Sequence, residues 1–150
     1  MSLTDDEQHD IARANELGLP PVVFVHGQGL LPGNWDPWRT VFEEQAFATV
    51  APGWPGDPEI AFVTSHHLEA VRSLHRPPAL VGHAAGGSVV LRLAGLGVSR
   101  STVAIGPFTD DPADVGNPGR SPLLIIDAED DEFPGITVAR TALDFIRRHQ

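Results

Sequence analysis

The stretch LVGHAAGGSVV (residues 80–90) decides the fold. Its first half is an apolar run typical of a buried strand, and its second half has the small and apolar residues of a packed helix. Gly82, Gly86 and Gly87 surround the junction, where the missing side chains let the backbone turn back sharply and the helix approach the sheet. The stretch therefore predicts a strand, a very tight turn at Ala84 and a helix that begins at once.

Similar apolar runs, rich in valine or isoleucine and bounded by glycine or proline, recur along the chain and are typical of buried parallel strands. They are PVVFVH (21–26), FATVA (47–51), PALVGH (78–83), STVAIG (101–106) and SPLLIID (121–127). Because helical patterns lie between them, the chain reads as successive strand-helix-strand units. The predicted fold class is α/β, a single doubly wound, mainly parallel five-stranded sheet with helices on both faces.

The segments between the strands give further expectations. Trp35, Trp38 and Phe42 lie at helical spacing, and either Asn34 or Asp36 could cap their helix. Residues 4–17 could form a polar leading helix, although fraying is equally expected there. Residues 107–119 have no periodicity and predict a long surface loop.

Composition limits the classes of partner. The 150 residues suffice for one domain, 1–150, and their net charge of −10 would repel nucleic acid and anionic membranes. The absence of cysteine excludes disulfides and thiolate metal sites. Because the sequence shows neither a leader pattern nor an apolar run of about 18 residues, we expect a cytoplasmic protein. We expect no cofactor and no metal.

Three segments resemble the α/β-hydrolase family, in the order that the family has them. VVFVHGQG (22–29) is similar to its first central strand and oxyanion turn, ALVGHAAGG (79–87) to its nucleophile elbow, and PLLIIDAEDDEFP (122–134) to the strand and turn that carry its catalytic acid. The resemblance implies a truncated hydrolase core with the strand order second, first, third, fourth, fifth, as in flavodoxin-like sheets.

Two departures from the family bear on activity. Ala84 stands where the elbow G-x-S-x-G carries its nucleophilic serine, and only one helix follows residue 134, where the family has a further strand with the general-base histidine. The family's inserted cap is also missing. The resemblance thus implies a minimal, capless member whose nucleophile position, Ala84, is inactive.

The resemblance also implies where a ligand would bind. The main-chain N–H groups of Gln28 and Ala85 would converge as an oxyanion hole, with Gly27 in the same turn. These donors belong to the backbone, so they do not depend on a serine hydroxyl. We therefore expect a small-molecule partner at this point, and Trp54 could form an aromatic wall beside it.

Several side chains are candidates for acid-base roles. His26 and His83 each follow a strand, where they could transfer protons, although packing is the commoner role of both positions in the family. Asp130 matches the acid position best, followed by Asp131. Such an acidic run is, however, usually a solvated loop. A divalent ion on Asp127, Glu129 and Asp130 is a weaker reading, because the turn has no loop glycine and no recognisable ligand pattern. His66 and His67 should open the helix after the second strand, with at least one exposed, and His149 should fray.

Three hypotheses remain open. The first is a degenerate hydrolase-like protein that binds a small carbonyl compound at the former oxyanion site and catalyses, if anything, a non-hydrolytic cyclisation, isomerisation or elimination. The second is a serine ester hydrolase with an engineered change at Ala84, and the third is a non-enzymatic interaction or sensor module. A homodimer through an exposed edge strand, 47–51 or 121–127, could cover the uncapped site.

Overall fold

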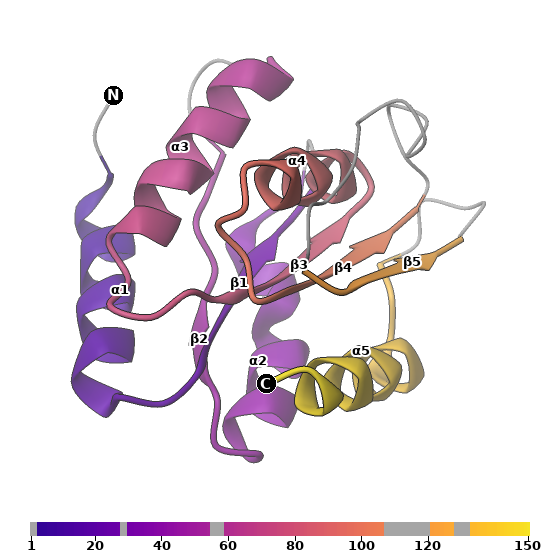
Figure 1. The fold of residues 1–150 in the computed structure, drawn as a ribbon. Helices are drawn as coiled ribbons and strands as arrows, with labels where there is room; N and C mark the ends of the chain where they lie inside the picture. Colours follow the sequence, from indigo (N-terminus) through magenta and orange to yellow (C-terminus); the bar gives the residue numbers. More distant parts are fainter. Residues whose placement is uncertain (1–2, 28–29, 55–58, 107–120, 128–132) are drawn as a thin grey trace.

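The computed structural model describes residues 3–27, 30–54, 59–106, 121–127 and 133–150. Five parallel strands form one sheet in the order β2-β1-β3-β4-β5, as predicted (Figure 1). The strands are β1 (Pro21–Val25), β2 (Ala48–Val50), β3 (Ala79–His83), β4 (Ser101–Ile105) and β5 (Leu123–Ile126). The helices are α1 (Asp5–Leu17), the short 3₁₀ helix η1 (Pro32–Trp35), α2 (Asp36–Glu43), α3 (Ile60–Arg72), α4 (Ala85–Gly95) and α5 (Ile136–Arg148).

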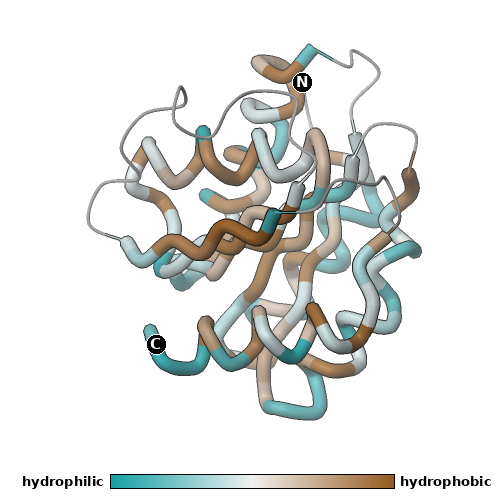
Figure 2. Tube along the Cα trace, turned by 90° about the vertical axis from the view of Figure 1, so that its right-hand side faces the viewer, coloured by the Kyte–Doolittle hydropathy of each residue, from teal (hydrophilic) through white to brown (hydrophobic). Residues whose placement is uncertain are grey.

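Helices cover both faces of the sheet, which confirms the doubly wound class (Figure 1). Side chains from α1, α3 and α4 pack on one face against Val23, Val25 and Leu80. Side chains from α2 and α5 pack on the other face against Phe24 and Val81. Successive strand residues point to opposite faces, so each central strand is buried on both sides and needs the unbroken apolar run found in its sequence. Figure 2 shows hydrophobic segments along these strands.

Aromatic side chains dominate the core between the sheet and α2. Phe24 stacks on Trp35 with ring centroids 5.0 Å apart, and Trp35 meets Trp38 edge-on at 5.1 Å and 87°. Both indoles are buried, as the helical spacing predicted. These rings therefore fix η1 and α2 against the sheet.

One predicted cap is wrong. Trp35 is the residue before α2, and it makes no side-chain capping bond. The Asn34 side chain instead accepts the Leu31 N–H at 2.8 Å, and Asp36 is the first residue of α2. The reason is that η1 runs directly into α2, so the chain has no extended residue at the junction at which a side-chain cap could act.

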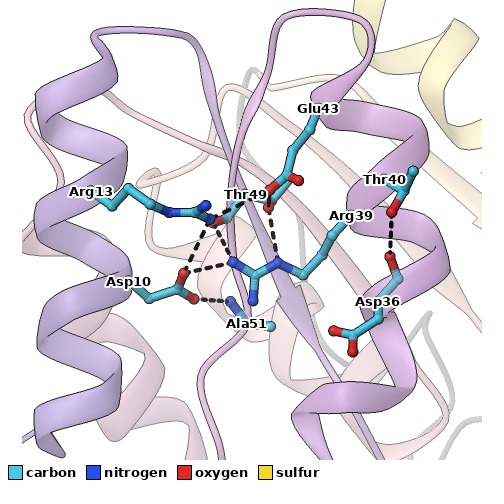
Figure 3. Close-up of polar contacts among 8 residues, drawn as sticks. All are labelled: Asp10, Arg13, Asp36, Arg39, Thr40, Glu43, Thr49 and Ala51. Carbon is cyan, nitrogen blue, oxygen red and sulfur yellow. Dashed lines mark hydrogen bonds and ion pairs between the residues drawn. The ribbon is translucent and has the colours of Figure 1, made fainter.

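The polar leading segment folds as α1 and packs beside β2. Arg39 of α2 donates from Nη2 to Asp10 of α1 at 2.6 Å and to the Thr49 carbonyl at 3.1 Å (Figure 3). Asp10 also accepts the Ala51 N–H at 3.0 Å, and Thr49 donates to Glu43 at 2.5 Å. The expectation of an exposed edge at 47–51 is therefore wrong, since α1 and this network bury β2. The outer strand β5 is only half-buried, and Ile125 is 41% exposed.

In the part of the chain that the structure describes, no helix combines the length and apolar character needed to cross a membrane. The predicted loop at 107–119 lies outside the described residues.

Candidate functional site

The corner between β3 and α4 is as tight as the sequence predicts. Ala84 has φ 56° and ψ −124°, a region that non-glycine residues rarely adopt and that costs on the order of 1–3 kcal/mol. A Cβ at Gly82 would come within 2.6 Å of the Gly86 carbonyl carbon, and one at Gly86 within 2.7 Å of the His26 oxygen. Backbone atoms cannot yield to such overlap, so the two glycines are required for this turn.

Two of the three backbone N–H groups considered at this corner have backbone acceptors, and that of Ala85 has none among the described residues. The Ala84 N–H donates to the Ile105 carbonyl of β4 at 2.8 Å, and the Gly87 N–H donates to the Ala84 carbonyl at 2.8 Å. The Ala85 N–H lies in the first turn of α4, where no helical carbonyl is available, and it has no backbone acceptor among the described residues. It is therefore available as a donor at the positive end of the helix dipole.

Gly27 lies directly against this corner. A Cβ built on it would be 3.2 Å from the Ala84 Cβ and 3.7 Å from the Ala85 nitrogen. Gly27, which follows β1, thus lies close to the Ala85 amide. Gln28, the other predicted donor, lies outside the described residues.

The His26 side chain bonds to the backbone of this turn at Gly27. It is buried, and its Nδ1 lies 2.8 Å from the Gly27 carbonyl, so the neutral ring carries its proton on Nδ1. Burial lowers the pKa of His26, and the hydrogen bond to Gly27 opposes that shift only in part. Trp54 donates from its indole to the His26 carbonyl at 2.6 Å and stacks on the imidazole at 6.1 Å and 25°. Trp54 is thus attached to the backbone that leads into Gly27.

His83 is buried on the opposite face of the sheet. Its ring meets Phe133 edge-on at 5.4 Å, and Phe133 packs in turn against Trp35 at 4.8 Å. The two predicted acid-base histidines therefore lie on different faces, both covered by aromatic rings. Proton transfer by either would have to pass through a packed environment.

Sequence reasoning missed a buried carboxylate-histidine pair, which binds the backbone next to Trp54 through the Gly53 N–H. Glu7 of α1 and His66 of α3 are only 6% and 4% exposed, and His66 Nε2 lies 2.8 Å from Glu7 Oε2. His67 is 0% exposed and its Nδ1 bonds to the Val63 carbonyl at 2.8 Å. The expectation that one of these histidines is exposed, and that they open their helix, is wrong. They lie in the middle of α3, which begins at Ile60, and Glu7 of α1 contacts His66.

The remaining predicted residues are separated from the corner or not described. Asp130, Asp131 and Glu129 lie outside the described residues, whereas Asp127 is exposed just after β5. Within the described ranges, no group of three potential ligands is placed to hold a metal ion. His149 follows the last residue of α5, and its ring contacts Phe145 at 4.7 Å.

Comparison with known proteins agrees with this architecture. Residues 22–148 match the family described as the alpha/beta hydrolase family. None of the curated proteins matches the sequence. Among solved structures, an epoxide hydrolase from Vigna radiata is 23% identical, with a TM-score of 0.54 over 58% of this chain and 31% of its own. A monoacylglycerol lipase from Paleococcus ferrophilus is 24% identical, with a TM-score of 0.53 over 57% of this chain and 38% of its own.

A third structure, Epoxide Hydrolase A from Mycobacterium thermoresistibile, is 21% identical, with a TM-score of 0.53 over 59% of this chain and 32% of its own. At these identities the likeness concerns the fold. The matched part amounts to about a third of each of these longer proteins.

Proposed function

The chain belongs to the alpha/beta hydrolase family, and from this premise we propose that it binds a small carbonyl-containing molecule at the corner between β3 and α4 without forming an acyl-enzyme. The Ala85 N–H carries this proposal, because it is the one donor of the predicted oxyanion hole that the described residues include. The carbonyl oxygen of the ligand would accept this N–H, and the Ala84 methyl group would form the floor beneath it.

Backbone rigidity supports binding at this point. Ala84 donates its own N–H to β4, and the Gly82 and Gly86 contacts leave the turn no room to relax. A donor held in place in this way loses little entropy when it binds. The helix dipole of α4 adds attraction for the partial negative charge on a carbonyl oxygen.

The absence of an acyl-enzyme follows from the side chain of Ala84. Covalent ester hydrolysis by a triad begins with a nucleophilic oxygen or sulfur, and a methyl group has neither. The same amide could stabilise an enolate or alkoxide, so a non-hydrolytic cyclisation, isomerisation or elimination is compatible with the proposal. His26 and His83 would then be the nearest bases along the chain, although both are buried.

Titration of ¹⁵N-labelled protein with acetone, N-methylacetamide or acetate tests binding directly. We expect a saturable shift of the Ala85 amide resonance, with an affinity of about millimolar for molecules this small. Gly27→Ala should weaken the binding, because its Cβ would press on the Ala84 Cβ at 3.2 Å and lie 3.7 Å from the donor nitrogen. Gly33→Ala is the matched control, since its Cβ would meet nothing closer than 3.9 Å. An Ala85 resonance that stays unmoved by all three compounds would refute the proposal.

The Ala84→Ser variant separates the proposal from the serine hydrolase alternative. It restores a hydroxyl at the corner without supplying a base next to it, so we expect no more hydrolysis of p-nitrophenyl acetate than with the parent protein. Rapid turnover, with acylation of the new serine seen by mass spectrometry, would show that the remaining machinery is intact. The chain would then be a hydrolase that lacks only its nucleophile.

A further inference from the structure

We propose that Glu7, in the helix that precedes the family match, is a positioning residue for the site: it holds the segment 51–54, and with it Trp54, over the turn that contains Gly27. This inference rests on the proposed function, since it concerns the geometry of that same site. The match to the family begins at residue 22, whereas α1 ends at Leu17.

Glu7 makes hydrogen bonds beyond those of a helix cap. Thr4 and Glu7 form a reciprocal capping box, in which Glu7 Oε1 accepts the Thr4 N–H at 2.8 Å. The second oxygen, Oε2, reaches outside the helix and accepts the Gly53 N–H at 2.8 Å as well as the contact from His66. A buried carboxylate needs such partners, and here they join α1 to α3 and to the loop after β2.

Contacts continue from Gly53 to the corner without a gap. Gly53 is followed by Trp54, whose indole donates to the His26 carbonyl and stacks on the His26 ring. The His26 ring holds the Gly27 carbonyl, and Gly27 lies against Ala84. A shift of the Gly53 amide would therefore move Trp54 and, through His26, the Gly27 backbone next to the Ala85 N–H.

Asp10 provides an internal comparison one turn later on α1. It too is a carboxylate that accepts a backbone N–H from the segment after β2, but its partner is Ala51 at 3.0 Å. Its other partners are Arg13 of the same helix, at 3.5 Å, and Arg39, which binds the β2 backbone at Thr49 (Figure 3). Asp10 thus fixes the end of β2, whereas Glu7 fixes the residue beside Trp54.

The experiment compares Glu7→Gln with Asp10→Asn in ¹⁵N-labelled full-length protein by native-state hydrogen exchange. Gln serves a capping box as Glu does, so its oxygen keeps the bond from the Thr4 N–H and its N–H₂ group faces the Gly53 N–H, whose bond therefore breaks. We expect exchange of the Gly53 N–H and the Trp54 indole N–H to accelerate about tenfold or more in Glu7→Gln. In Asp10→Asn the Ala51 N–H should accelerate instead, and the Trp54 indole should stay within about twofold of its parent rate.

Equal acceleration of the Trp54 indole in both variants, in proportion to their lost stability, would overturn the inference and leave Glu7 a purely structural residue. If Glu7→Gln does not fold, His66→Leu replaces it, because it removes the imidazole that contacts Glu7 Oε2 and puts no donor in its place. The same selective change at Gly53 and Trp54 is then expected, and its absence would overturn the inference. Exchange needs no ligand, so it decides the role of Glu7 even if the carbonyl titration fails, and titration of the parent protein alone decides the proposed function.

Discussion

Mild acid should destabilise this protein through His67. The side chain is 0% exposed, and burial lowers its pKa from 6.5 to about 4, with the bond to the Val63 carbonyl only partly opposing the shift. In the unfolded chain the ring takes up a proton near pH 6.5, whereas in the folded chain it stays neutral until about pH 4. Stability is therefore fully present above pH 6.5 and falls as the pH drops from 6.5 towards 4.

The difference between 6.5 and about 4 corresponds to about 3 kcal/mol, of which roughly 2 kcal/mol should be lost between pH 7 and pH 5. Burial lowers the pKa of His26 as well, so its contribution has the same sign. For Glu7, burial acts to raise the pKa, but the bonds from His66, Thr4 and Gly53 outweigh it and lower the pKa below 4.5. The stability due to Glu7 is therefore lost only below pH 4.5, outside this window.

Urea unfolding of the parent and of His67→Gln, at several pH values from 7 to 5, measures the effect. The variant cannot take up a proton at this position, so its free energy of unfolding should fall by roughly 2 kcal/mol less than that of the parent over this range. His75→Gln is the control and should follow the parent, since His75 is exposed in the folded protein. The reasoning is refuted if His67→Gln loses as much stability as the parent.

Two further predictions concern the backbone. Gly86→Ala should lower the free energy of unfolding by more than about 3 kcal/mol or prevent folding, because its Cβ would lie 2.7 Å from the His26 oxygen. Gly97 has φ 75° and no neighbour within 4 Å of a built Cβ, so Gly97→Ala should cost only about 1 kcal/mol in the same urea titration. Similar costs for the two alanines would contradict the packing argument. Thr4→Ala removes the capping bond to Glu7 N–H at 3.2 Å and should lower stability by about 1 kcal/mol in thermal unfolding, and an unchanged melting temperature would show that the cap is unimportant.

Local sequence features predicted the sheet well. Each strand is a short apolar run, and in β1, β2, β3 and β4 burial on both faces leaves little choice of residue. The corner at Ala84 was predictable for the same reason, because only glycine avoids the overlaps at Gly82 and Gly86. These features are determined by neighbouring residues in the chain.

Long-range pairings escaped prediction. Glu7 and His66 are 59 residues apart, and nothing in the sequence near either residue shows that they will pair. At least one of His66 and His67 was therefore expected at the surface, and β2 was expected to be an exposed edge. The cap of α2 was missed because a 3₁₀ turn joins the helix without the extended residue that a side-chain cap needs.

The three tryptophans report on different faces of the sheet, so two spectroscopic signals can follow the two faces separately. Trp35 and Trp38 lie nearly at right angles on the α2 side, where neighbouring indoles in a fixed orientation produce an exciton couplet in circular dichroism. Trp54 lies on the α3 side with an imidazole against its ring, which quenches indole emission when protonated. Recording dichroism and fluorescence during one refolding experiment would therefore reveal whether the two layers assemble together or one after the other, with no label attached.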